Sequence, residues 1–286
     1  MDEPLRTHSR RWLLSRGLAA GAAVTVPVTL GALPASAALA TVDMEQVLLA
    51  CQVDPPKPNS DLTPGAAPHA NIVEQALRAE GLLAAAQVDG HYGVATLSAY
   101  AAWQRSLGFT GIDANGVPGR TSLTALGSGR FTVTNLVTAG SRTDSYGGMR
   151  VNTRTANMLR AADQLVSSSI VLTQGSYTSD NPDSAGTHDG GGVVDIRVIN
   201  LTTTQRWELV RALRTVGFAA WLRTPSDGFA YHIHANAISD PDMSRTGRDQ
   251  VNDYYFGRNG LANNAADNTP QQYRVPLTWW ERYQRG

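Results

Sequence analysis

Residues Ser184–Asp195 read S-A-G-T-H-D-G-G-G-V-V-D, and this stretch decides how the second half of the chain is expected to fold. It holds a histidine, His188, and an aspartate, Asp195, on either side of a triple glycine. Glycine adopts backbone conformations that other residues avoid, so the triple glycine allows the chain to turn back between the two side chains. The run Val193–Val198 is rich in β-branched residues, which predicts a strand that carries Asp195.

A second segment, Tyr231–His234, reads Y-H-I-H and also predicts a strand. Successive side chains on a strand point to opposite faces, so His232 and His234 are expected side by side on one face. With His188, the two segments hold three of the six histidines in the chain. Zinc favours His and Asp ligands, and a catalytic zinc ion typically takes three protein ligands and keeps one position for water. The two segments together therefore predict a metal pocket.

Helical and strand-like patterns alternate around these motifs. Apolar residues recur at helical spacing in the segments 152–167, 205–216 and about 245–256. Short runs rich in β-branched and aromatic residues predict strands at 169–173, 193–198, 218–222 and 229–234. This mixture predicts an α+β domain with a mainly antiparallel sheet, which we place at residues 129–286. The closing pair Trp279-Trp280 and Tyr283 are expected to pack onto it.

The histidine and aspartate motifs resemble those of the LAS metallopeptidases, the group of lysostaphin-type, D-alanyl-D-alanine and hedgehog-like zinc domains. The signature of that group is S-x-H-x-x-G-x-x-x-D, followed later by Trp or Tyr and then H-x-H. The match covers roughly residues 131–240 and consists of Gly186-Thr187-His188, Gly191-Gly192, Asp195 and Tyr231-His232-Ile233-His234. The resemblance implies Zn²⁺ held by His188, Asp195 and His234, with His232 beside the bound water.

Two positions depart from the carboxypeptidase branch of the group. That branch has a glutamate three residues before the last ligand, where this chain has Tyr231. The endopeptidase-like branch uses the first histidine of H-x-H, so His232 is the candidate catalytic residue, as general base or oxyanion stabiliser. The carboxypeptidases also clamp substrate with an arginine in an S-G-Y-R loop, where this chain has Gln174-Gly175-Ser176-Tyr177. Tyr177 or Gln174 is expected to bind substrate there, unless the substrate itself differs.

A motif occurs twice in the preceding part of the chain. It consists of a D/N-G-x-x-G turn, a Thr or Ser that caps a helix, and the apolar helix itself. The turn occurs at Asp89–Gly93 and in a shorter version at Asn115–Gly119. This pattern resembles the peptidoglycan-binding domain of bacterial wall hydrolases over about residues 67–128, and the matching positions are Val73, Gln75, Leu77, Asp89-Gly90, Tyr92-Gly93, Thr96, Ala99, Trp103-Gln104, Gly108-Phe109 and Gly116–Gly119. The resemblance implies a small three-helix fold that adheres to peptidoglycan, and a helical spacer without a ligand is the alternative. His91, within the first turn, is expected to be exposed.

The N-terminus carries the features of an export signal, expected to span residues 1–37. Ser9–Leu14 reads S-R-R-W-L-L, which matches the twin-arginine signature. An apolar stretch, Gly17–Leu33, follows, and Ala35-Ser36-Ala37 offers the small residues that signal peptidase reads. An uncleaved membrane anchor is the alternative, but the stretch is weakly hydrophobic and slightly short for a bilayer span. We expect a secreted, cell-wall-associated protein without membrane contact after cleavage.

Residues 38–66 are expected to form a linker or N-terminal arm. The part from Asp54 to Pro68 is rich in Pro, Asn, Ser and Gly and has no hydrophobic period. A short amphipathic helix is expected before it, at Val42–Val53, with Cys51 as a small apolar contact. Cys51 is the one cysteine of the chain, which rules out an intramolecular disulfide.

Composition and motifs together favour one function. Lysine plus arginine and aspartate plus glutamate each number 24, and this balance argues against nucleic acid as a partner. The two resemblances point to one polymer, so we predict a secreted zinc-dependent peptidoglycan peptidase. It would act as a carboxypeptidase or an endopeptidase on stem peptides or cross-links, through a zinc-activated water. The missing glutamate and arginine motivate the alternative of a non-catalytic wall-binding protein with a structural or vestigial zinc site. A zinc hydrolase with another substrate is a third reading.

Overall fold

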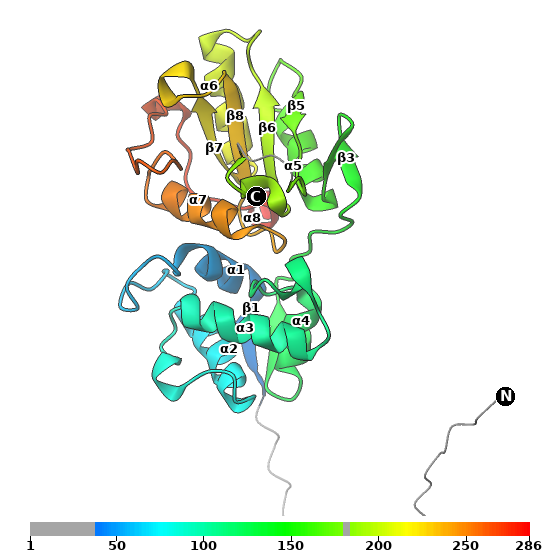
Figure 1. Cartoon of the computed structure of the whole chain (residues 1–286), viewed down its shortest axis with the longest axis vertical. Helices are drawn as coiled ribbons and strands as arrows, with labels where there is room; N and C mark the ends of the chain where they lie inside the picture. The colour runs from blue at the N-terminus through cyan, green and yellow to red at the C-terminus, as the bar shows by residue number, and fades with distance from the viewer. Residues whose placement is uncertain (1–37, 180–183) are drawn as a thin grey trace, which may run out of the picture. The chain divides into compact units, whose positions relative to one another are not determined.

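Asp195, His232 and His234 lie on strands of a four-stranded sheet (Figure 1), and His188 lies in a short turn that precedes one of these strands. The computed structural model describes residues 38–179 and 184–286, so the expected signal segment lies outside the described residues. The sheet has the order β5-β6-β8-β7, and every neighbouring pair is antiparallel. Its strands are β5 (Leu172–Gln174), β6 (Val193–Arg197), β7 (Phe218–Arg223) and β8 (His232–Ala237). The expected α+β class with a mainly antiparallel sheet is confirmed.

Two helices cover the back face of this sheet. α5 (Thr153–Asp163) begins after Asn152, whose side chain accepts a hydrogen bond from Thr155 N. α6 (Thr203–Thr215) begins with a capping box formed by Thr202 and Gln205. The apolar sides of both helices pack on the sheet in a core that includes Leu159, Val194, Ile196, Leu213, Leu222 and Ile233. Full burial of such a side chain is worth roughly 1.5–3 kcal/mol, so this core holds the strands in register.

The last strand begins later in the sequence than expected. The pattern predicted a strand over 229–234, whereas β8 runs from His232 to Ala237. A short 3₁₀ turn at Pro225–Asp227 is followed by Gly228, which has a φ of 87°. This left-handed conformation favours glycine and separates the turn from the strand. The correction leaves both histidines on the strand, at its first and third positions.

The helix α1 (Met44–Val53) lies inside the folded body. It packs against α7 (Arg245–Tyr255) on one side and contributes to the first hydrophobic core on another. Nine of its ten residues are therefore buried, so the expected amphipathic pattern is wrong. Residues 40–53 contribute a strand and a buried helix and are not merely an arm. Burial raises the pKa of the Cys51 thiol to about 12, which fits an apolar contact inside the core.

Four helices and a pair of strands build the first core. Besides α1, the helices are α2 (Ala67–Ala79), α3 (Val94–Ser106) and α4 (Arg120–Gly127). The strands β1 (Ala40–Asp43) and β2 (Phe131–Thr134) pair in parallel. Phe131 and Val137 belong to this core, which therefore extends past the boundary expected at residue 129. From Leu39 onward the chain forms one compact unit that contains both cores.

The first glycine turn is fixed by a buried carboxylate. Glu74 on α2 accepts hydrogen bonds from the backbone N–H of Asp89 and Gly90 and from the Thr96 hydroxyl. His91 is 1 % exposed, and neither ring nitrogen has a hydrogen-bond partner within the described part of the chain. The expectation that His91 is exposed is wrong. Its ring folds over Gly93, where an added Cβ would lie 2.7 Å from Nδ1.

The C-terminal tail fastens α1 and α5. Trp279 is buried and its indole N–H donates to Glu45, and Arg285 donates two hydrogen bonds to the same carboxylate at 2.6 and 2.8 Å. The helix α8 (Trp280–Arg285) also carries Glu281, which forms an ion pair with Arg154 of α5 at 2.8 Å. The expected packing of the terminal aromatic residues onto the domain is confirmed.

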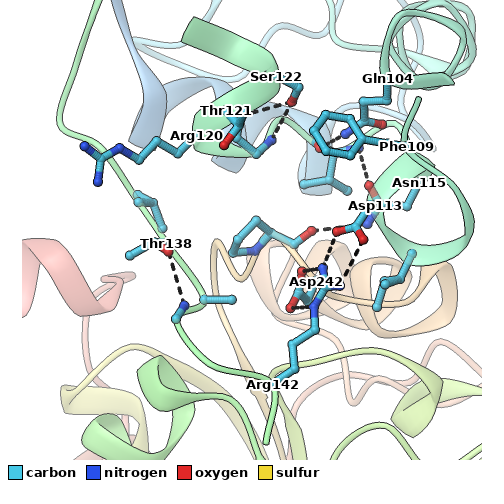
Figure 2. A pocket seen from close by; sticks show the side chains of 17 residues that line it. Gln104, Phe109, Asp113, Asn115, Arg120, Thr121, Ser122, Thr138, Arg142 and Asp242 are labelled. Atoms are coloured by element: carbon cyan, nitrogen blue, oxygen red, sulfur yellow. Dashed lines mark hydrogen bonds and ion pairs between the residues drawn. The ribbon is translucent and has the colours of Figure 1, made fainter. Parts of the chain in front are cut away.

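A cavity of about 470 Å³ lies where residues of the first core meet the loop after β8 (Figure 2). Arg142 bridges it, donating to Asp113 Oδ1 and to Asp242 Oδ1, both at 2.6 Å.

Before α5 the chain also forms a hairpin of β3 (Asp144–Tyr146) and β4 (Met149–Val151). No helix among residues 38–179 and 184–286 is long and apolar enough to cross a bilayer.

We predict that Glu74 makes stability depend on pH. Burial raises the pKa of Glu74 to about 7, although its hydrogen-bond donors act in the opposite direction. The folded state therefore holds a proton that the unfolded chain releases near its ordinary pKa of 4.5, so this contribution to stability is lost as the pH rises from 4.5 to about 7. Glu74→Gln should remove the dependence, and its urea midpoint should exceed that of the wild type by more at pH 8 than at pH 5.

Glu208→Gln serves as the matched control, because Glu208 is exposed on α6. Its midpoint should follow that of the wild type at both pH values. Equal differences between Glu74→Gln and wild type at pH 5 and pH 8 would contradict the assignment.

Candidate metal centre

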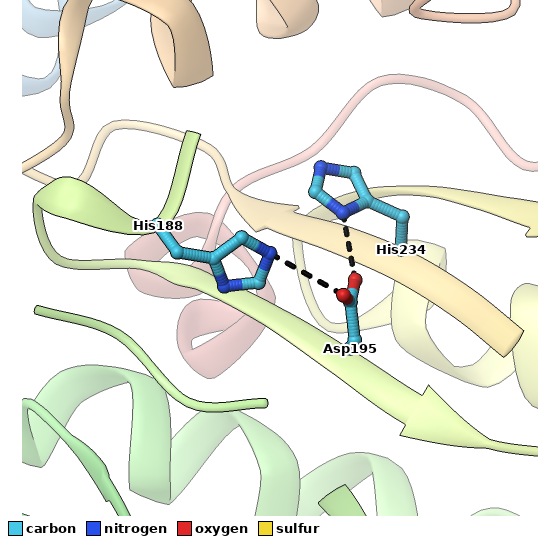
Figure 3. Close-up of side chains that lie close together, drawn as sticks. All are labelled: His188, Asp195 and His234. Atoms are coloured by element: carbon cyan, nitrogen blue, oxygen red, sulfur yellow. Dashed lines mark hydrogen bonds and ion pairs between the residues drawn. The ribbon is translucent and has the colours of Figure 1, made fainter. Parts of the chain in front are cut away.

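Three side chains from separate elements converge on one point (Figure 3). His188 lies in a 3₁₀ turn (Thr187–Asp189), Asp195 on β6 and His234 on β8. Each offers a ligand atom, and these atoms lie within 4.8 Å of one another. His188 Nε2 lies 3.5 Å from Asp195 Oδ2, and His234 Nδ1 lies 2.8 Å from Asp195 Oδ1. The structure thus brings together the three residues that the sequence predicted as ligands.

The ring of His188 is oriented by a backbone carbonyl. Its Nδ1 lies 2.8 Å from the oxygen of Gly175. A carbonyl oxygen only accepts, so Nδ1 carries the proton and the Nε2 lone pair faces Asp195. Gly175 permits this arrangement, because a Cβ there would lie 2.3 Å from the backbone oxygen of Arg150.

A helical glutamine orients the second imidazole. Gln250 on α7 places its Oε1 2.8 Å from His234 Nε2, and the same oxygen accepts from Asn236 Nδ2 at 2.9 Å. Its Nε2 donates to the Gly260 carbonyl at 3.1 Å, which fixes which end of the amide is the oxygen. His234 Nε2 therefore carries a proton, and Nδ1 is the nitrogen turned toward Asp195, where a bound cation would take the place of the proton shared with Oδ1. Such outer contacts set the tautomer of metal-binding histidines.

Gln250 is a site residue that no sequence pattern predicted. The residue lies 16 positions after His234, on a different element and in a polar helical segment. Nothing in its spacing distinguishes it from the other amides of the chain. The helix packing that brings it to the imidazole is a property of the tertiary structure.

The pKa shifts of Asp195 and His234 suit a divalent cation. Burial alone would raise the pKa of Asp195, but hydrogen bonds and charge from His188 and His234 lower this pKa far below its ordinary range. Burial lowers the pKa of His234, with Asp195 acting in the opposite direction. An ionised carboxylate and neutral imidazoles are the forms that bind metal. Two nitrogens and one oxygen also match the ligand types that zinc prefers.

These groups line a cavity of about 380 Å³. His232 lines it too, but does not belong to the group of three. Its Nδ1 lies 2.8 Å from the oxygen of Ala230, so its Nε2 holds the lone pair, 3.8 Å from Asp195 Oδ1. His232 is partly exposed, whereas His188 and His234 are buried. His232 therefore lies next to the candidate metal ligands without belonging to them.

The two predicted substrate-binding residues lie in different places. Gln174 lines the cavity, opposite Asp195 on the neighbouring strand. Tyr177 is not among the lining residues, and its hydroxyl donates to Asp242 Oδ2 at 2.7 Å. Its backbone N–H also donates to the Gly190 oxygen at 2.9 Å, so Tyr177 links the loop after β8 to the segment that follows His188.

The triple glycine allows two loops to meet closely. A Cβ at Gly190 would lie 2.3 Å from the oxygen of Asp242, and one at Gly192, where φ is +83°, would lie 2.9 Å from Asp240 Cβ. Gly191 N donates to the Asp242 oxygen at 2.8 Å. The glycines therefore serve a close backbone approach as well as the predicted turn. Because Asp242 also binds Arg142, the loop of His188 is linked to the first core.

Comparisons of the chain with protein-family models, with curated proteins and with solved structures gave no match. The resemblances drawn from short motifs therefore stay predictions.

We predict that Gln250→Ala weakens zinc binding about 10- to 100-fold, the usual effect of removing an outer partner of a metal-binding histidine. Without the glutamine oxygen, the His234 ring loses the contact that keeps its Nδ1 turned toward Asp195. Competition with a chromophoric chelator measures the change. Gln75→Ala, at an exposed position of α2, is the control and should bind zinc as the wild type does.

A second prediction concerns the ligand set itself. His188→Ala should abolish stoichiometric zinc binding, because two remaining donors do not complete a zinc site of at least three protein ligands. Elemental analysis of the purified, dialysed variant provides the measurement. Retention of one zinc ion per chain would show that the assigned ligands are wrong.

Proposed function

We propose that this protein is a zinc-dependent peptidase that hydrolyses the peptides of peptidoglycan. The observation that carries the proposal is the convergence of His188, Asp195 and His234 at an open cavity, with a fourth polar group, His232, beside them. A catalytic zinc site has three protein ligands and an open position, which is the arrangement these residues offer.

The contacts of each side chain indicate the role that it would have in the reaction. Asp195 and the two buried imidazoles would hold the ion, in tautomers already set by Gly175 and Gln250. Zinc, when bound, lowers the pKa of water toward ~7 and polarises the scissile carbonyl. The cavity walls, which include Gln174 and Phe229, would place the peptide across this point.

His232 is the proposed proton carrier. Its Nδ1–H is engaged by Ala230, so its Nε2, which lies 3.8 Å from Asp195 Oδ1, would take a proton from the attacking water and pass it to the leaving amine nitrogen. Tyr231 occupies the position at which the carboxypeptidase branch of the LAS group has a glutamate. Its side chain packs against the core behind the sheet. Its ring also lies under Arg206, at 4.2 Å from the guanidinium carbon. The residue before His232 is therefore directed away from the chemistry.

The alternative of a structural zinc site requires a closed shell of four protein ligands. Among the described residues, the group able to hold a metal ion contains three side chains, and they line a cavity. This favours the catalytic reading. Peptidoglycan as the substrate rests on the resemblance of residues 67–128 to a wall-binding domain, and on the resemblance of the zinc motifs.

Digestion of purified muropeptides tests the proposal. The zinc-loaded protein should release an amino acid or a peptide, detected by mass spectrometry, and removal of zinc with a chelator should stop the release. A zinc-loaded wild type that releases nothing would refute the peptidase assignment.

We further predict that His232→Ala lowers kcat by about 10²- to 10⁴-fold, the usual contribution of a general acid–base group. Zinc content should stay stoichiometric, because His232 lies outside the ligand group. His69→Ala, a partly exposed histidine far away in the sequence, is the control and should retain wild-type kcat. Unchanged kcat in His232→Ala would exclude this residue as the proton carrier.

A further inference from the structure

We propose that Arg223 binds a carboxylate of the substrate at the wall of the metal cavity. This inference rests on the proposed function and adds to it the chemistry of the group that the site recognises. Arg223 ends β7, and the pairing of β7 with β8 places it directly opposite His232. Directly opposed residues share a face of the sheet, so Arg223 lies on the face that carries the metal-binding groups. It is one of the residues that line the cavity.

The guanidinium of Arg223 is buried without an anion. The residue is 3 % exposed, and its Nη1 donates to the oxygen of Asn259 at 2.6 Å. Its Nη2 has no hydrogen-bond partner, and Arg223 forms no ion pair with a carboxylate of residues 38–179 or 184–286. Burying an unpaired charge costs free energy, so such groups usually serve a partner.

The other contacts of Arg223 do not neutralise its charge. The guanidinium lies over the Trp221 ring at 5.1 Å, which holds it in place. Burial lowers the pKa of Arg223 to about 10, and the charges of Asp227, Asp195 and Asp267 oppose this effect. The side chain therefore remains charged at neutral pH, and no carboxylate of residues 38–179 or 184–286 is in direct contact with it.

The charge of the cavity favours an anionic ligand. Among the described lining residues, Arg223 is the one Arg or Lys and Asp195 the one carboxylate. Asp195 is already engaged by two imidazoles. A divalent cation together with Arg223 would outweigh that single negative charge, and a fork of N–H donors matches a carboxylate.

Access to Nη2 passes by Gly260. A Cβ on Gly260 would lie 3.3 Å from Nη2 and 3.0 Å from the Trp221 ring, so this segment covers the guanidinium with backbone alone. Gly260 also lines the cavity and accepts the hydrogen bond from Gln250. Because Nη2 is closed to solvent, binding includes an outward shift of the segment at Gly260.

Two substrate groups have the required chemistry. One is the free C-terminal carboxylate of a stem peptide, which a carboxypeptidase would bind. The other is a carboxylate on a residue within the peptide, which an endopeptidase would bind next to an internal scissile bond. In either case Arg223 supplies from β7 the cation that the loop Gln174–Tyr177 lacks.

The test measures the binding of peptides to the purified zinc-loaded protein by calorimetry. It is independent of any hydrolysis. The probes are an acetylated stem pentapeptide with free carboxylates, the same peptide amidated at its C-terminus, and the same peptide amidated at its internal carboxylates. Arg223→Gln should bind the free peptide about 10- to 100-fold more weakly, as expected for a lost hydrogen bond to a charged group. Arg197→Gln is the control, because Arg197 is exposed on the other side of His232 in the same row of the sheet.

The amidated probes identify the source of the carboxylate. If Arg223 binds the C-terminal carboxylate, amidation of the C-terminus should weaken binding of the peptide to the wild type and leave its binding to Arg223→Gln unchanged. If Arg223 binds an internal carboxylate, amidation of the internal carboxylates should have this effect instead. Equal binding of all probes by wild type and Arg223→Gln overturns the proposal, as does a wild type that binds none of them. Loss of binding in Arg223→Gln without any hydrolysis by the wild type would uphold this site and refute the peptidase function.

Arg223→Lys guards against a folding defect in the glutamine variant. It keeps the charge but not the fork of donors, so its affinity for the free peptide should lie between the other two proteins. Thermal unfolding and zinc content of all variants are measured first. Wild-type affinity in a folded Arg223→Lys together with wild-type affinity in Arg223→Gln would dismiss a role for this side chain.

Discussion

The candidate site depends on one register, the antiparallel pairing of β6 with β8 that sets Asp195 directly opposite His234. A slip of one residue would turn every side chain of one strand to the other face of the sheet. The back face opposes such a slip, because Ile196 and Ile233 are paired there and fully buried. Apolar burial behind the sheet thus holds three polar groups together in front of it, where they would otherwise have no reason to meet.

Orientation of the two imidazoles comes from outside the sheet. One ring is turned by the Gly175 carbonyl and the other by Gln250, which belongs to α7. α7 in turn rests on α1, whose Glu45 is bound by the C-terminal tail. The direction of a nitrogen lone pair is therefore linked through packed helices to the N-terminal part of the folded chain. This explains why a segment that looks like an arm in the sequence is buried in the structure.

The same face of the sheet carries two kinds of charge with different neighbours. Asp195 is negative and contacts two histidines, while Arg223 is positive and forms no ion pair with a carboxylate of the described residues. A buried pair with both partners inside the protein would be complete without a ligand. The proposed carboxylate of the substrate would supply the partner of Arg223 at the cavity.

Local patterns in the sequence were sufficient for the α+β class, because strand and helix periodicities act over a few residues. The grouping of His188, Asp195 and His234 was expected from the resemblance of two motifs to those of the LAS group, and the structure places the three side chains close together. Local patterns also placed His232 beside the group, since alternation puts it on the same face as His234. The identity of the cross-strand and helical neighbours was decided by tertiary structure alone. Gln250 and Arg223 reach the site only through the packing of α7 and the pairing of β7 with β8. His91 and α1 are buried for the same reason: burial depends on what packs against a segment, and a local pattern does not contain that information.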